Sequence, residues 1–232
     1  MSIDIKGFQK TDLVNFDPYS CATIYLSRCN FLCPFCHNPE LVIGHDKLNS
    51  LSKEKILDVL TKRKKWYDAV CITGGEPTLH KGLVHFTKEL KKIGFLVKID
   101  TNGTNPKMIN QLIDKKIVDF ISMDVKAPLE KYDKITQINT DTSKIKESIE
   151  TLKNRRLDYE FRTTVIPRFH KKADIEKIGK LLKGSKQITI QQFRNSRDMI
   201  NPSFKNEKPY SREKLIEFRE ILSDYAKEVR IR

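Results

Sequence analysis

The sequence contains no run of about 18 apolar residues, which argues against a transmembrane helix. Residues 1–18 carry charges but no apolar segment of the kind found in secretory signals. The chain has only five cysteines, an odd number, so a framework of structural disulfides is a poor explanation for them. It also has no internal repeat, low-complexity tract or clear linker. These absences predict a globular protein of the reducing cytoplasm, with no membrane partner.

The chain is strongly basic, with 44 Lys and Arg against 30 Asp and Glu and a formal net charge of +14. Such a charge indicates either a nucleic-acid site or a solvated, lysine-rich surface. The lysines are spread over nearly every predicted helix, and the densest run is KRKK at 62–65. Dispersed charge favours the solvated surface over nucleic-acid binding. A basic face would still attract an acidic partner, such as a small electron carrier.

Short apolar segments alternate with segments of helical periodicity along most of the chain. The expected strands are 22–27, 69–75, 95–100, 118–126, 159–167 and 187–193. The expected helices are 50–64, 80–94, 105–116, 142–155, 173–184 and 211–229. Six βα units over 22–229 predict an α/β fold with a parallel sheet, either doubly wound or closed into an incomplete barrel. We expect a single domain over 1–232, with residues 1–20 as an N-terminal extension that packs on the barrel or frays.

Residues able to bind a ligand follow the predicted strands. Because parallel strands end at one edge of a sheet, we expect these residues to meet there. They are Cys29, Cys33 and Cys36 after the first strand, TGGEPTL at 73–79, DTNG at 100–103, Asp124 and Lys126, and Arg194 after the sixth strand.

Three cysteines within eight residues indicate a metal centre, but structural zinc needs a fourth ligand. His37 adjoins Cys36, and adjacent residues rarely reach one tetrahedral ion together. Cys71 lies in an apolar strand, and Cys21 precedes the first strand, at the opposite end from the loop. A [4Fe–4S] cluster usually takes four thiolates, so three would leave one iron open to another ligand. A zinc knuckle remains the alternative.

The Cys29-x3-Cys33-x2-Cys36 spacing, with Phe35 before the last cysteine, resembles the signature of the radical S-adenosylmethionine (SAM) superfamily. The resemblance implies a partial (β/α)6 barrel, a [4Fe–4S] cluster on the three cysteines, and SAM on the open iron. The GGEP segment resembles the family motif that approaches the methionine amino group, which assigns Gly74, Gly75 and Glu76 to that role.

Two further motifs, DTNG at 100–103 and DVK at 124–126, are similar to those of glycyl-radical-enzyme activating proteins. By this resemblance, Lys126 would contact the carboxylate region of SAM, and the DTNG motif would hold SAM and a monovalent cation, Na+ or K+. The residues so implied are Asp100, Thr101 and Asp124 as cation ligands, with a backbone carbonyl near Ser122, and Asn102 within the motif.

The segment from GFQKTDL to HNPEL resembles one branch of these proteins, the activating proteins of anaerobic ribonucleoside-triphosphate reductase. His37 and Asn38 would then lie beside the cluster and bind it or SAM through hydrogen bonds. Two departures stand out. Arg28 replaces the usual glycine before the first cysteine, and Arg194 stands where a related activating enzyme has a histidine.

The resemblance implies an enzyme that cleaves SAM reductively and generates a glycyl radical on a partner, anaerobic ribonucleotide reductase. Flavodoxin or ferredoxin would supply the electron. The alternatives are a radical SAM enzyme acting on another glycyl radical enzyme of the pyruvate formate-lyase type, on a small molecule or on RNA. A non-enzymatic zinc or iron–sulfur module is a further alternative.

Overall fold

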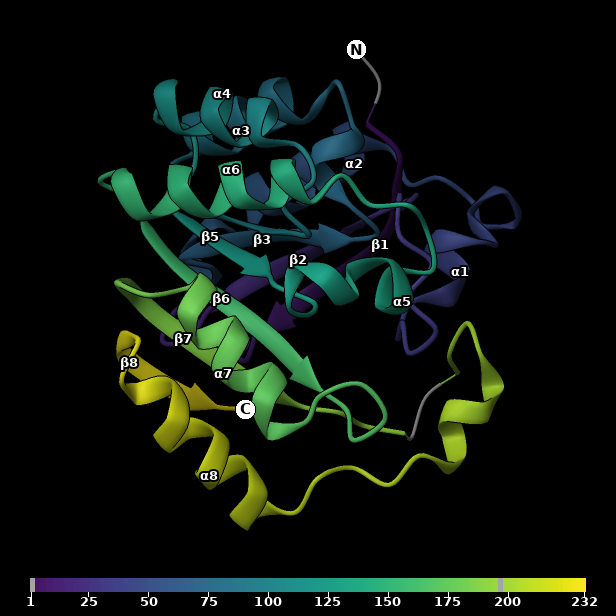
Figure 1. The fold of residues 1–232 in the computed structure, drawn as a ribbon. Helices are drawn as coiled ribbons and strands as arrows, with labels where there is room; N and C mark the ends of the chain where they lie inside the picture. The colour runs from purple at the N-terminus through teal and green to yellow at the C-terminus, as the bar shows by residue number, and fades with distance from the viewer. Residues whose placement is uncertain (1–2, 196–197) are drawn as a thin grey trace. The chain divides into compact units, whose positions relative to one another are not determined.

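A computed structural model describes residues 3–195 and 198–232 (Figure 1). The chain forms two compact units, each described here by itself. The first unit comprises residues 1–30, 40–101 and 105–121, and the second comprises 31–39, 102–104 and 122–232. Helix α1 (Pro39–Val42) and strand β5 (Phe120–Asp124) are divided between them.

The first unit is built on four strands: β1 (Ile5–Asp12), β2 (Cys21–Leu26), β3 (Ala69–Gly74) and β4 (Leu96–Thr101). Strands β2, β3 and β4 are parallel neighbours, with Ile24 opposite Ile72 and Ile72 opposite Ile99. These apolar strands are almost entirely buried, as expected for a parallel sheet that is covered on both faces. The predicted strands 22–27, 69–75 and 95–100 are therefore confirmed.

A strand lies within residues 1–20, where the sequence predicts only an N-terminal extension that packs on the barrel or frays. Residues 5–12 form β1, which pairs antiparallel with β2. The register shifts between Ile5 and Gly7 and again between Gln9 and Asp12. These irregularities interrupt the alternation of apolar and polar residues, so the segment has no clear strand pattern in the sequence.

The helices of the first unit begin and end where local signals predict. Ser52 caps α2 (Lys53–Lys62), Gly94 ends α3 (Leu83–Ile93) with φ 97°, and Pro106 opens α4 (Pro106–Asp114). Helix α3 packs against β4. The unit also has short 3-10 turns, η1 (His45–Lys47), η2 (Lys64–Trp66) and η3 (Pro77–Leu79).

The second unit contains three parallel strands: β6 (Asp158–Val165), β7 (Ser185–Gln192) and β8 (Ala226–Ile231). Ile188 on β7 lies between Phe161 and Val229 in the register. The helices are α5 (Tyr132–Thr136), α6 (Thr142–Asn154), α7 (Lys172–Leu181) and α8 (Arg212–Ser223), with 3-10 turns η4 (Leu129–Lys131) and η5 (Pro202–Asn206). Helix α8 packs against β7 and β8 and lies beside α7 (Figure 1).

The predicted helix over 211–229 is wrong at its C-terminal end. Helix α8 stops at Ser223, and residues 226–231 form β8. The turn between them places Tyr225 against Gly179 and lets its carbonyl oxygen accept from the Gly184 N–H. The Glu and Lys residues of this segment favour a helix locally, but the pairing of β8 with β7 overrides that preference. None of the helices in the described residues is long and apolar enough to cross a membrane.

Candidate functional site

In the first unit, the predicted site residues meet at one edge. Strands β2, β3 and β4 are parallel, so their carboxyl ends lie together. This edge carries six of the predicted residues: Cys29, Gly74, Gly75, Glu76, Asp100 and Thr101.

The glycine turn after β3 is formed by close backbone contact. Gly74 has φ 117°, and a Cβ built on Gly75 would lie 1.8 Å from the carbonyl oxygen of Arg28. That same oxygen accepts a hydrogen bond from the Glu76 N–H at 2.7 Å. Glycine is therefore required at position 75 by space and at position 74 by conformation.

The carboxylate of Glu76 is buried and accepts several hydrogen bonds. Its Oε1 accepts from the Thr78 N–H at 3.0 Å, from the Thr78 hydroxyl, and from the Thr101 hydroxyl at 2.7 Å. The side chain thus caps η3 and joins the ends of β3 and β4. Burial with these donors fixes the orientation of the carboxylate.

Asp100 lies against a buried lysine of its own strand. The Lys98 ammonium is 3.0 Å from Asp100 Oδ1 and also donates to the carbonyl oxygen of Asn15. The Lys98 side chain is only 1% exposed. A buried ammonium requires a carboxylate partner, so the two charges belong together.

Cys33 and Cys36 lie in the second unit, in a turn closed by a 3.0 Å hydrogen bond from the Cys36 N–H to the Cys33 carbonyl. Phe35 between them is buried, with its ring 6.0 Å from that of Phe169 and 6.2 Å from that of Phe204. Phe35 therefore anchors the loop by aromatic packing. Its predicted role in cofactor binding stays a prediction.

Burial is the main influence on the Cys33 thiol and raises its pKa to about 11. All five cysteines lie in the described part of the chain, and none forms a disulfide. Three thiols within one short stretch, none of them in a disulfide, are a donor set that suits an iron–sulfur cluster.

His37 is held against the end of β7. Its ring stacks on Phe193 at 6.1 Å, and its Nε2 is 2.8 Å from the carbonyl oxygen of Arg194. The Arg194 side chain is exposed, and this hydrogen bond with His37 is made by the Arg194 backbone. A contact of the Arg194 side chain with SAM stays a prediction. Asn38 is half-buried.

Asn102 and Gly103 shape the turn that follows β4. Asn102 Oδ1 accepts from the Thr104 N–H at 3.0 Å and from the Thr104 hydroxyl at 2.7 Å. Gly103 has φ 78°, and a Cβ there would lie 2.1 Å from Met123 Cε. The motif is thus a tight turn in which the Asn102 side chain hydrogen-bonds its own backbone.

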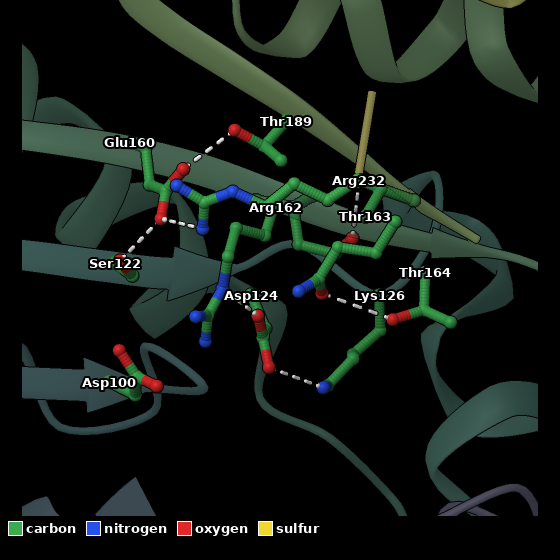
Figure 2. A network of polar contacts seen from close by, with 12 residues as sticks. Asp100, Ser122, Asp124, Lys126, Glu160, Arg162, Thr163, Thr164, Thr189 and Arg232 are labelled. Carbon is green, nitrogen blue, oxygen red and sulfur yellow. Dashed lines mark hydrogen bonds and ion pairs between the residues drawn. The ribbon is translucent and has the colours of Figure 1, made fainter. Parts of the chain in front are cut away.

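Asp124 is held between two cations (Figure 2). Its Oδ1 accepts from Arg162 Nε at 2.9 Å, and its Oδ2 accepts from Lys126 Nζ at 2.9 Å. Burial would raise the pKa of the Asp124 carboxyl, but the charges of Arg162 and Lys126 outweigh it and lower that pKa well below its usual range. The predicted residues Asp124 and Lys126 are therefore in direct contact, and Arg162 joins them.

Sequence reasoning missed Arg162 and its neighbour on the strand, Glu160. The Glu160 carboxylate is buried and accepts from Ser122 Oγ at 2.7 Å and from Thr189 Oγ1 at 2.6 Å (Figure 2). The signal was two charged residues at alternating positions of a predicted strand, YEFRTTV. Burying a charged side chain costs free energy of folding unless the charge is paired. Two such side chains on one face of a buried strand therefore indicate a polar interior.

His170 is a second residue that sequence reasoning missed. It is fully buried, and its Nδ1 accepts from the Ile166 N–H at 3.1 Å. The proton therefore lies on Nε2, which donates to the Lys126 carbonyl oxygen at 2.9 Å. The Lys126 N–H in turn donates to the Tyr132 hydroxyl at 3.1 Å. Both backbone groups of Lys126 are thus fixed.

The predicted carboxylate ligands of the cation each lie against a protein cation of their own unit. Asp100 faces Lys98, and Asp124 faces Arg162 and Lys126. A monovalent cation at either carboxylate would therefore lie beside a positive charge that is already present.

The chain matches the model of the radical SAM superfamily over residues 23–182. A protein of Methanocaldococcus jannaschii, provisionally named a glycyl-radical enzyme activating enzyme, is 33% identical over 233 residues, covering 98% of this chain and 95% of that protein. The 7-carboxy-7-deazaguanine synthase of Methanospirillum hungatei is 37% identical over 112 residues, covering 47% of this chain and 43% of that protein.

Among solved structures, a domain of pyruvate-formate lyase-activating enzyme from Bacteroides vulgatus has a TM-score of 0.57 and 17% identity, covering 71% of this chain and 98% of that one. At this identity the likeness is one of fold, and it confirms the α/β fold of radical SAM type that the sequence predicts. Membership implies a [4Fe–4S] cluster and SAM, and the donor chemistry of the three thiols fits that cluster. The chain belongs to the radical SAM superfamily.

Proposed function

We propose that the protein is an activating enzyme that uses a [4Fe–4S] cluster and SAM to generate a glycyl radical on a partner enzyme. The observation that carries the proposal is the loop with Cys29, Cys33 and Cys36, which leaves β2 at the edge that also bears the glycine turn. The relative from M. jannaschii supports the activating role, because the similarity extends over nearly the whole of both chains.

When bound, the cluster would supply the electron for reductive cleavage of SAM to methionine and an adenosyl radical, which would take a hydrogen atom from a glycine Cα of the partner. The three thiolates would hold the cluster. The turn at Gly74 and Gly75 would bring the backbone close to the methionine amino group, for which the oriented carboxylate of Glu76 would be an acceptor.

Lys126 would bind the carboxylate of SAM. Asp124 is shared by two cations, Lys126 and Arg162, so the three side chains carry a surplus of one positive charge. That surplus favours a carboxylate ligand. His170 and Tyr132 fix the Lys126 backbone and so hold the ammonium in place.

The proposed partner is anaerobic ribonucleotide reductase, and flavodoxin or ferredoxin is the proposed electron donor. Both small carriers are acidic proteins that the net charge of +14 would attract. The proposed location is the reducing cytoplasm, which the odd number of cysteines and the clustering of three of them support.

The cluster is tested by anaerobic reconstitution with iron and sulfide. Wild-type protein should take up about four irons per chain and cleave SAM when reduced. Cys33→Ala should lose both properties. Cys71→Ala is the matched control, because Cys71 is buried in the core of β3 beside Cys21 and should leave the iron content unchanged. Retention of SAM cleavage by Cys33→Ala would contradict the cluster assignment.

The partner is tested by incubating the reduced protein and SAM with anaerobic ribonucleotide reductase and recording electron paramagnetic resonance. A glycyl radical signal supports the proposal. Similarity to a 7-carboxy-7-deazaguanine synthase over 47% of the chain keeps a small-molecule substrate as the second candidate. SAM cleavage without a radical on the reductase, or on a pyruvate formate-lyase type enzyme, would favour that candidate or RNA.

A further inference from the structure

The two carboxylates at which a bound monovalent cation was predicted each lie against a protein cation within their own unit. We infer that Lys98 and Arg162 supply the positive charge that such a cation would supply, so that SAM binds to this protein without a bound Na+ or K+. The inference rests on the proposed function only in that it takes SAM as the ligand.

In the first unit, the Lys98 ammonium forms an ion pair with the Asp100 carboxylate. The Lys98 ammonium is 3.0 Å from Asp100 Oδ1, and 6.0 Å from the ring centres of both Phe16 and Phe120. It lies on β4 among apolar side chains, where water cannot replace the carboxylate. The negative charge of Asp100 is therefore already balanced by a charge that cannot leave.

In the second unit, the Arg162 guanidinium forms an ion pair with the Asp124 carboxylate. Arg162 is almost fully buried on β6, and its Nε donates to Asp124 Oδ1 while Lys126 donates to Oδ2. Both oxygens of the carboxylate thus receive a charged donor. A sodium or potassium ion at Asp124 would have to lie beside two fixed positive charges, and the repulsion between them opposes its binding.

The neighbouring acidic side chain does not change this balance. Glu160 is occupied by Ser122, Thr189 and the Arg232 guanidinium, which is 3.4 Å from Glu160 Oε1. Arg162 is a covalent part of β6, so its charge is present at every salt concentration. A bound ion, by contrast, would be lost when the salt is removed or replaced.

The test is the Kd of SAM for the reconstituted wild-type protein, measured without oxygen in buffers of equal ionic strength. The only monovalent cation in each buffer is Na+, K+ or tetramethylammonium, which is too large to enter a site made for the first two. The same Kd in all three supports the inference. Loss of affinity in tetramethylammonium, or a saturable rise of the apoprotein's Tm with Na+ or K+, would overturn it. Failure to bind SAM in any buffer would instead contradict the proposed function.

The variant Arg162→Gln sharpens the test, because it removes the charge but keeps a hydrogen-bond donor. Its affinity for SAM should fall about tenfold in tetramethylammonium, the loss expected for one charge-assisted hydrogen bond, and should recover in part with Na+ or K+. Arg162→Lys keeps the charge and should bind SAM in all buffers.

The control is Arg168→Gln, which removes a more exposed arginine that pairs with Glu207 at 2.9 Å and should leave the Kd unchanged. Wild-type affinity in Arg162→Gln under every condition would show that the charge of Arg162 is not needed, and would overturn the inference.

Discussion

The carbonyl oxygen of Arg28 lies where the side chain of any residue other than glycine at position 75 would begin. A Cβ at Gly75 would be 1.8 Å from that oxygen and 2.5 Å from the carbonyl carbon. Both obstructing atoms belong to the backbone, so no rotamer change can relieve the contact. The residue before the first cysteine and the glycine turn after β3 are thus packed directly together.

Gly75→Ala should destabilise the protein by about 3 kcal/mol, because the backbone at Arg28 must move to admit one methyl group. Chemical denaturation of the apoprotein measures this loss without reference to activity. Gly44→Ala is the control, since its Cβ would meet the Glu40 carbonyl oxygen at an ordinary 3.4 Å. Equal stability of the two variants would contradict the predicted clash.

Arg28→Gly should leave the protein as stable as wild type or slightly more stable. Arg28 has φ 65°, a left-handed conformation that costs a residue other than glycine about 1 kcal/mol. Glycine removes that cost but gains freedom in the unfolded chain, and the two effects nearly cancel. Arg28→Val, with a branched Cβ, should be clearly less stable in the same denaturation experiment. A large loss of stability in Arg28→Gly would show that the arginine side chain has a structural role.

Thr101→Val should cost about 2 kcal/mol, because it removes a charge-assisted hydrogen bond from the buried Glu76 carboxylate. Thr87→Val is a matched change at another buried threonine. The Thr87 hydroxyl donates only to carbonyl oxygens of its own helix, at Leu83 and Val84, so this variant should be nearly neutral. Urea unfolding of both variants gives the difference, and no difference would argue against a network centred on Glu76.

Stability should fall as the pH drops below about 6.5, the ordinary pKa of histidine. Burial lowers the pKa of both His80 and His170 in the folded protein, outweighing the opposing influence of their hydrogen-bonded carbonyls and of Asp4 and Asp174. The unfolded chain therefore takes up protons that the folded chain does not. The slope should reach about 1.4 kcal/mol per pH unit for each histidine.

Denaturant unfolding between pH 7.5 and pH 5.5, values that bracket about 6.5, measures this slope. The variant His170→Asn keeps a side chain that can donate and accept but cannot take up a proton in this range, so its slope should be smaller. A slope identical to that of wild type would show that His170 does not contribute.

The sequence predicts most of the interior strands because each is a short, nearly continuous apolar run. The segment 22–27 matches β2, and 69–75 matches β3, to within a residue or two. Strands β1 and β8 were not predicted, because they contain charged residues at positions where the pattern of a buried strand requires apolar ones. Their strand conformation depends on a partner strand, which local sequence does not specify.

The same distinction holds for the site. Motifs that are contiguous in sequence, such as the cysteine loop and the turn at Gly74, are visible directly. Arg162 and His170 are not, because each acts on a residue about 40 positions away: Arg162 on Asp124 and His170 on the Lys126 carbonyl. The pairing of Arg162 with Asp124 was missed for this reason, since the two residues lie on different strands.

Strands β1 and β8 have a further consequence, for the behaviour of the protein in concentrated solution. Among the described strands, β1 pairs only with β2, and β8 only with β7, so each is an edge strand. Within the described part of the chain, the outer edge of β1 is covered only at Ile5, which forms an isolated bridge with Leu51. The register of β1 is broken twice, and β8 reads AKEVRI, with charged side chains at three of its positions. Irregular, charged edges are poor templates for another chain's strand. The segments that were hardest to recognise as strands are thus the ones that protect the protein against edge-to-edge aggregation.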